Sequence, residues 1–321
     1  MKPLRKYLDS IKPKFTSGGS LEKYFPIYDV FENLFYSSDK RTFGSVHIRD
    51  NIDLQKVMVV VWMATFPAMF YGMYNLGYQS LTAFEQIGSI NKDDWHFFFI
   101  DLLCSYDPKS IFDCIWFGAC YFIPIYLVTF IVGIAWEVIF AVVRGHEINE
   151  GAFVTTVLFA LCCPPDAPLW QVALGISFGI VVAKEIFGGT GKNFLNPALA
   201  GRAFLYFAYP VNWSGDSVWV AVDGYSAPTI LGIGAQEGLQ GIQAQYSWSE
   251  AFLGSIPGSI GETSTLFILL GLAILLYTRV ASWRIIAGVL LGTFLTSELF
   301  NLIGSETNPM FSLPFHWHLV I

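Results

Sequence analysis

The sequence contains few charged residues. Only 13% of its 321 residues are Asp, Glu, Lys or Arg, whereas a soluble domain carries about 25%. The charges cluster, so neutral stretches long enough to cross a bilayer recur along the chain. Hydrophobic residues make up 54% of the sequence and aromatic residues 17%, and Trp and Tyr rings are typical of membrane interfaces. We therefore predict an all-α polytopic membrane protein rather than one very apolar soluble domain.

Several kinds of functional site are also missing from the sequence. The five cysteines show neither a CxxC nor a zinc spacing, and no carboxylate pair, nucleophile–base set or nucleic-acid patch stands out. His316 and His318 flank Trp317, but residues two apart do not share a helix face. We expect an aromatic interface anchor there, and no metal site. Residues 1–20 hold five Lys or Arg without an apolar core, so we expect no cleavable signal peptide.

Seven apolar stretches are predicted to span the membrane. They cover residues 57–74, 114–143, 151–164, 168–183, 203–211, 263–278 and 285–303, and an apolar stub covers 319–321. The second stretch is too long for one upright helix. A helix of this length, with a rise of about 1.5 Å per residue, is longer than the hydrocarbon core of about 30 Å. Tilt, or a kink near Pro124, would accommodate it. The fifth is short, as half-helices that stop inside a membrane often are.

The positions of Lys and Arg predict the orientation. Ten of the eighteen lie at or before Lys56, and none lies between Arg202 and Arg279. Lys184, Lys192 and Arg202 mark a cytoplasmic loop in this interpretation. We therefore expect a cytoplasmic N-terminal segment over residues 1–54, whose basic cluster contacts lipid headgroups. A transmembrane domain over residues 55–321 follows, with an outer loop at about 211–262.

Five other stretches are distinctive in composition. The outer loop contains Asp223-Gly224-Tyr225-Ser226-Ala227-Pro228-Thr229, which by composition alone is a Gly/Pro turn with an exposed hydroxyl. The stretch 184–202 reads KEIFGGTGKNFLNPALAGR, and shorter signals stand at 47–50 (HIRD), 149–151 (NEG) and 258–262 (GSIGE). Together they closely resemble the B subunits of bacterial Na⁺-translocating NADH:quinone oxidoreductases, over nearly the whole chain.

This resemblance implies a fold of ten spans in two inverted five-helix repeats, related by an axis in the membrane plane. The present chain supplies about seven of those spans. The family continues beyond the region of Trp317 with further helices, so we expect the sequence to be a fragment. The resemblance also implies the bacterial inner membrane, with the outer loop in the periplasm.

The resemblance assigns a covalent flavin to the outer loop. In the family, a threonine that ends this type of motif is joined to FMN through a phosphoester, made by a periplasmic flavin transferase with FAD as donor. The matching residue is Thr229, and Asp223 and Ser226 belong to the same flavinylation motif. The sequence departs from the family at Ala227 and Pro228, where Gly and Ala are usual.

A second flavin is expected near the Gly-rich stretch. Asn193 and Asn196 match family residues close to a non-covalent riboflavin, and their amides suit a flavin ring or ribityl chain. The open alternative is a Gly-rich re-entrant turn that lines a cavity. A phosphate-binding loop is excluded, because Ile186 and Asn193 stand where GxxxxGK[ST] needs Gly and Ser or Thr.

Glu137 is an ionisable residue inside an apolar stretch, which makes it a functional candidate. The plainer interpretation is an acid that reaches the cytoplasmic interface near Arg144. In the family, the region matching Gly133, Trp136 and Glu137 is implicated in quinone and inhibitor binding, and Ile134 replaces a second Gly.

The function implied by the resemblance is redox-driven ion transport. Electrons from NADH would enter through the partner subunits (A, C, D, E and F). They would pass to FMN on Thr229, to riboflavin, and then to ubiquinone, coupled to Na⁺ movement. Two alternatives stay open: the equivalent subunit of the Rnf ferredoxin:NAD oxidoreductase, which shares the flavin motif, and a non-redox transporter or channel of similar design. The leader of about 55 residues favours the quinone reductase.

Overall fold

The computed structural model describes residues 2–16, 18–25, 28, 32, 54–88, 92, 94–145, 151–305 and 307–321. All regular structure in these residues is helical, and they contain no β-strand. The prediction of an all-α polytopic membrane protein is confirmed, because four apolar segments of this part of the chain are long enough to cross a bilayer. They are Lys56–Ile87, Ile111–Arg144, Leu169–Phe187 and Trp283–Ile303.

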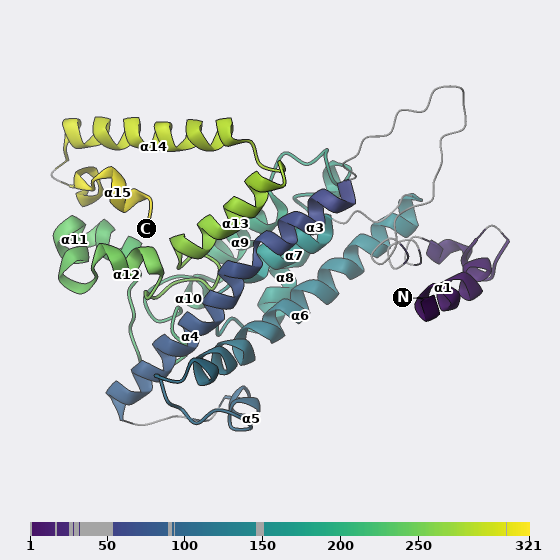
Figure 1. Ribbon diagram of the computed structural model, residues 1–321, viewed down its shortest axis with the longest axis horizontal. Coiled ribbons are helices and arrows are strands. Elements are labelled where there is room, and N and C mark those ends of the chain that lie inside the picture. Colours follow the sequence, from purple (N-terminus) through teal and green to yellow (C-terminus); the bar gives the residue numbers. More distant parts are fainter. Residues whose placement is uncertain are drawn as a thin grey trace.

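Two long helical segments form the centre of the molecule and run side by side in Figure 1. The first combines α3 (Leu54–Ala64) and α4 (Phe66–Ile87), and the second is α6 (Ile111–Arg144). Glycines allow their backbones to approach, because a Cβ at Gly77 would lie 1.9 Å from the Cys114 carbonyl oxygen. The prediction that the first span ends at Tyr74 is wrong. The helix continues to Ile87, where Gly88 adopts a left-handed conformation and caps it.

Helix α6 stays one helix of 34 residues with Pro124 inside it. At about 1.5 Å per residue it is about 50 Å long, which is more than the hydrocarbon core of about 30 Å. It therefore tilts or projects beyond the core. Its start is fixed by Ser110, whose side chain accepts a hydrogen bond from the Asp113 amide, and its end by Gly145 in the left-handed region.

Three apolar helices are too short to cross a membrane alone, since a span needs about 20 residues. They are α7 (Gly151–Leu161), α9 (Pro197–Ala208) and α13 (Thr265–Tyr277). The C-terminal end of α7 meets the turn before α13, where Gly261 N–H donates to the Leu161 carbonyl at 3.0 Å. Between α7 and α9 lies α8 (Leu169–Val181), followed by the 3₁₀ turn η2 (Glu185–Phe187). Helix α9 begins six residues before the predicted span at 203, because Asn196 caps it and Pro197 starts it.

Residues 211–262, which the sequence predicted to be an outer loop, contain helices. They are α10 (Pro210–Trp213), α11 (Ile230–Gln245) and α12 (Trp248–Leu253), and Gly238 kinks α11 with a φ of 67°. Side chains of α11 and α12 form an apolar cluster with Leu313 and Trp317, next to the turn η3 (Pro309–Ser312) and helix α15 (Phe315–His318). Figure 1 places this group at the left edge, below α14 (Trp283–Ile303). Trp317 is 2% exposed, so the expected interface anchor is wrong.

Two smaller elements complete the described chain. Helix α1 (Lys2–Phe15), with the turn η1 (Glu22–Tyr24), belongs to the N-terminal segment and lies at the right of Figure 1. Helix α5 (Phe97–Ile100) lies in the turn between α4 and α6. The main hydrophobic core joins α4, α6, α7, α8 and α9, and α3 lies beside it and lines two of the cavities described below.

Candidate functional site

Thr229 is the N-cap of α11. Its Oγ1 accepts a hydrogen bond from the Gly232 N–H at 3.1 Å, and its backbone is extended. This contact uses one lone pair and leaves the O–H proton and the second lone pair for another partner. A phosphoester on this oxygen would place negative charge at a helix N-terminus, which the free amides and the helix dipole favour. The local structure therefore fits the group that the motif implies.

The departure from the family motif at Ala227 fits the backbone around Thr229. Ala227 is 5% exposed, and its N–H donates to the Asp216 carbonyl at 2.8 Å. Among the described non-glycine residues a positive φ occurs only at Tyr106 and Arg279. Ala227 therefore needs no glycine. Its small side chain packs against the core. Thr229, two residues later, is the N-cap of α11.

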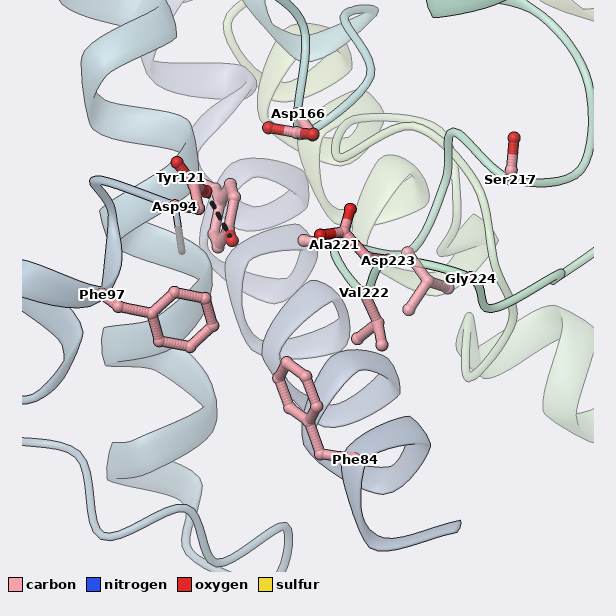
Figure 2. Close-up of a pocket in the computed structure, with 11 residues that line it drawn as sticks. Phe84, Asp94, Phe97, Tyr121, Asp166, Ser217, Ala221, Val222, Asp223 and Gly224 are labelled. Carbon is pink, nitrogen blue, oxygen red and sulfur yellow. Dashed lines mark hydrogen bonds between the residues drawn. The ribbon is translucent and has the colours of Figure 1, made fainter. Parts of the chain in front are cut away.

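Three other residues of the motif lie at the surface or border a cavity. Asp223 and Ser226 are exposed, and Tyr225 connects the segment to α4 by donating its hydroxyl to Gln86 Oε1 at 3.1 Å. Figure 2 shows the Asp223 carboxylate directed into a cavity of about 300 Å³, on the side where Asp94 and Asp166 lie. The structure therefore brings an acid of the outer-loop motif to a site that also receives residues from the turns of the bundle.

The two predicted riboflavin asparagines line one cavity of about 370 Å³. Half of each amide is already used by the chain. Asn196 Oδ1 accepts from the Ala198 and Leu199 amides at 3.0 and 3.4 Å, and Asn193 Nδ2 donates to the Leu195 carbonyl at 2.7 Å. The Asn196 NH₂ group and Asn193 Oδ1 are the polar atoms left to face a ligand. The sequence left two alternatives for this stretch, a re-entrant turn and a riboflavin site. The structure is compatible with both, because a turn can line a ligand cavity.

The substitution Asn196→Asp distinguishes the role of Asn196 as the cap of α9 from its proposed role in binding a flavin. Asn196→Asp keeps the cap of α9, since Asp and Asn cap helices equally well, whereas Asn196→Ala loses about 1 kcal/mol of helix stability. We expect Asn196→Asp to leave the thermal denaturation midpoint of the purified complex unchanged. It should lower the non-covalent flavin released on acid precipitation, because the amide donor is gone. Asn196→Ala should lower both quantities. An unchanged flavin content in both variants would remove Asn196 from the binding site.

Glu137 lies in a buried ion pair that the sequence did not predict. Its carboxylate and the Lys184 ammonium form a short contact, and both side chains are 3% exposed. The suggestion that Glu137 reaches the interface near Arg144 is wrong. Arg144 instead binds Glu185, with Nη1 2.8 Å from Glu185 Oε2. Two acids and two cations from α6 and the 184–185 turn therefore alternate at this end of the bundle.

Lys184 connects this charge network to the asparagine cavity. It lines that cavity together with Thr155, Thr190, Asn193 and Asn196. Lys184 thus contacts Glu137 and shares a cavity with the two asparagines, while Thr229 is the N-cap of α11, a helix at the left edge of Figure 1. In the sequence, Lys184 served only to predict the orientation of the chain. Its pairing could have been suspected from Glu137, because a buried carboxylate in an apolar stretch requires a cation as its partner.

Gly133 and Trp136 are packed between helices. A Cβ at Gly133 would lie 2.6 Å from Thr156 Cγ2, so α6 and α7 need a glycine there. Trp136 Nε1 donates to Ser177 Oγ at 2.8 Å, which joins α6 to α8. A separate apolar cavity of about 390 Å³ lies nearby, lined by Met58, Val59, Trp62, Tyr126, Leu127, Phe130 and Phe153. Met58 also lines the asparagine cavity, so the two spaces are neighbours.

Arg202 does not mark the same end of the bundle as Lys184 and Lys192. Its Nε donates to the Cys162 carbonyl at 3.1 Å and its Nη2 to the Trp213 carbonyl at 2.9 Å. Cys162 follows the end of α7 opposite to Gly151, whereas Gly151 lines the cavity with Lys184. The side chain is therefore drawn into the protein by carbonyl oxygens, and its use as a cytoplasmic marker is wrong.

Parts of two signals fall outside the described residues. The 47–50 stretch (HIRD) and residues 149 and 150 of the NEG stretch belong to them. Gly151, which closes that second stretch, begins α7 and lines the asparagine cavity.

Residues 41–321 match the family described as "NQR2, RnfD, RnfE family". Three similar relatives are named as the B subunit of a "Na(+)-translocating NADH-quinone reductase". The protein of Chromohalobacter salexigens is 57% identical over 320 residues, which are 99% of this chain and 77% of the relative. The proteins of Pseudomonas paraeruginosa and Azotobacter vinelandii are each 55% identical over 320 residues, 99% of this chain and 79% of theirs.

Proposed function

The chain belongs to the NQR2, RnfD, RnfE family, and from that premise we propose that it is the B subunit of a Na⁺-translocating NADH:quinone oxidoreductase. The observation that carries the proposal is the match along nearly the whole chain to subunits of that name. In the proposed assembly it joins subunits A, C, D, E and F in the bacterial inner membrane. Its N-terminus is cytoplasmic and residues 211–262 face the periplasm.

We propose that Thr229 carries FMN. The Thr229 Oγ1 would form the new bond to the FMN phosphorus of FAD, the pyrophosphate P–O bond would break, and AMP would leave. The hydroxyl proton passes to the flavin transferase. The N-cap geometry supports this assignment, because the amides at the start of α11 are available to the phosphate that results. Asp223 and Ser226 are exposed on the same segment, where an external enzyme can reach them.

We propose that the asparagine cavity takes riboflavin. Asn193 Oδ1 and the Asn196 NH₂ group would hydrogen-bond it, and the Lys184 ammonium would face the same space. A bound flavin supplies the one- and two-electron chemistry, and the protein supplies position and local charge. Lys184 is held by Glu137, so the charge that meets the ligand is fixed in place before binding.

Quinone binding is proposed at the same end of the bundle, in the region of Gly133, Trp136 and Glu137. The apolar cavity beside the asparagine cavity supports this location, because its aromatic and aliphatic lining suits an isoprenoid tail. Ubiquinone is the quinone expected from the family resemblance. The ion moved is Na⁺, as in the names of the relatives.

Membrane vesicles that contain the whole complex test this function. We expect NADH to reduce added ubiquinone only when Na⁺ is present, and inverted vesicles to take up ²²Na⁺ during the reaction. The family also includes Rnf subunits. Electron exchange between ferredoxin and NAD without quinone reduction would favour that alternative, and vesicles without any bound flavin would favour a non-redox transporter.

A further inference from the structure

Asp94, His96 and Asp166 come together from two separate turns of the chain, and Asp94 and Asp166 line the cavity shown in Figure 2. Asp94 and His96 precede α5, and Asp166 lies between α7 and α8. One potential ligand atom of each residue lies within 4.8 Å of those of the other two. Such spacing allows a single ion to contact all three side chains, because metal–ligand bonds of about 2.0–2.2 Å separate ligand atoms by less than this limit.

The histidine is held in a fixed orientation. His96 is 5% exposed, and its Nδ1 lies 2.5 Å from Asp94 Oδ2. The same Asp94 oxygen accepts a hydrogen bond from the Tyr121 hydroxyl at 3.1 Å, and the Tyr121 ring stacks on the imidazole with centroids 4.1 Å apart. A carboxylate on one ring nitrogen leaves the other as a lone-pair donor, which is the usual arrangement around metal-binding histidines.

The cavity concentrates negative charge. Asp94, Asp166 and Asp223 all line it, and its described lining contains neither Lys nor Arg. A bound cation would offset the repulsion between the three acids.

We propose that Asp94, His96 and Asp166 bind a divalent first-row transition-metal ion on the outer side of the bundle. One imidazole with carboxylates suits ions such as Co²⁺, Mn²⁺ or Zn²⁺, whereas Na⁺ and Mg²⁺ prefer oxygen ligands alone. Asp223 borders the same cavity, so the ion would connect both turns with the segment that leads to Thr229. The site stands on its own geometry and does not require that a flavin be attached.

The test measures Co²⁺ bound to the purified complex after chelation, by equilibrium dialysis and elemental analysis with NaCl at about 100 mM, where the Debye length is about 10 Å. We expect His96→Gln and Asp166→Asn each to bind one equivalent fewer than the wild type. The matched control is Asp101→Asn, which removes an exposed carboxylate of the same turn that pairs with Lys92 at 2.8 Å; it should keep the full amount. Asp94→Asn should weaken binding by at least about 10- to 100-fold, because it removes both a ligand carboxylate and the group that holds His96 Nδ1.

Folding of each variant is checked by its yield in the complex and by its thermal denaturation midpoint. If one variant fails to assemble, the other two still compare with the wild type. Equal Co²⁺ content in the wild type and in the assembled variants would overturn the proposal. So would a Co²⁺ content that rises when the NaCl is replaced by choline chloride at equal ionic strength, which would show a monovalent site that Na⁺ occupies.

Discussion

Thr229→Asn is expected to abolish covalent flavin on this subunit while leaving the protein folded. Asparagine caps a helix as well as threonine does, so the Gly232 N–H keeps an acceptor and α11 keeps its start. An amide cannot form the phosphoester. With the flavin transferase co-expressed, the wild-type band should fluoresce under ultraviolet light after denaturing electrophoresis, and the Thr229→Asn band should be dark.

Thr229→Ser is the matched control for this experiment. Serine keeps both the hydroxyl and the cap, so its band should fluoresce. Retained fluorescence in Thr229→Asn would mean that the flavin is attached at another residue, and a dark wild-type band would end the covalent proposal altogether. Ser226→Ala adds a further comparison, because Ser226 is exposed and its loss removes only the neighbouring hydroxyl of the motif.

Lys184→Met is expected to destabilise the protein by about 3–5 kcal/mol, because the Glu137 carboxylate loses its ammonium partner in a buried position. Replacing both residues, as in Glu137→Met with Lys184→Met, should restore most of that stability, since apolar side chains of similar size pack without charge. The measurement is the free energy of unfolding in a denaturant titration of the purified complex. Destabilisation well below this range in Lys184→Met would show that the pair is not a structural element.

The double variant also separates stability from binding. Lys184 lines the asparagine cavity, so a stable double variant should still contain less non-covalent flavin than the wild type. If the double variant recovers both stability and flavin content, Lys184 acts only through packing. A matched control is Arg144→Met, which removes the more exposed cation of the neighbouring pair, whose side chain is 33% exposed.

Much of the fold was predictable, because it follows from local features of the chain. Long apolar stretches between charged residues predicted all four segments of the described chain that are long enough to cross a membrane. Helix ends were less predictable, and the differences have local causes that a hydropathy pattern does not detect. Asn196 and Pro197 start α9 before the apolar stretch begins, and the amphipathic end of α4 continues as far as Gly88.

Less of the candidate site was predictable. The motif around Thr229 and the asparagines of the Gly-rich stretch are contiguous in sequence, so a resemblance could identify them. Their hydrogen bonds could not be foreseen, because cap geometry decides which half of each amide is free. Arg202 illustrates the opposite error, since its charge suggested a surface position and the Cys162 and Trp213 carbonyls hold it inside.

The class of protein, the approximate spans and the contiguous motifs can be predicted from the sequence, because apolar length and local turn chemistry act along the backbone. Which charges meet depends on the packing of the helices. Glu137 and Lys184 are 47 residues apart, and Asp94 and Asp166 come from turns that α5, α6 and α7 separate along the chain. Such pairs depend on how helices pack in space. Burial makes each unpaired charge costly, so packing must satisfy it with whichever partner the fold brings near.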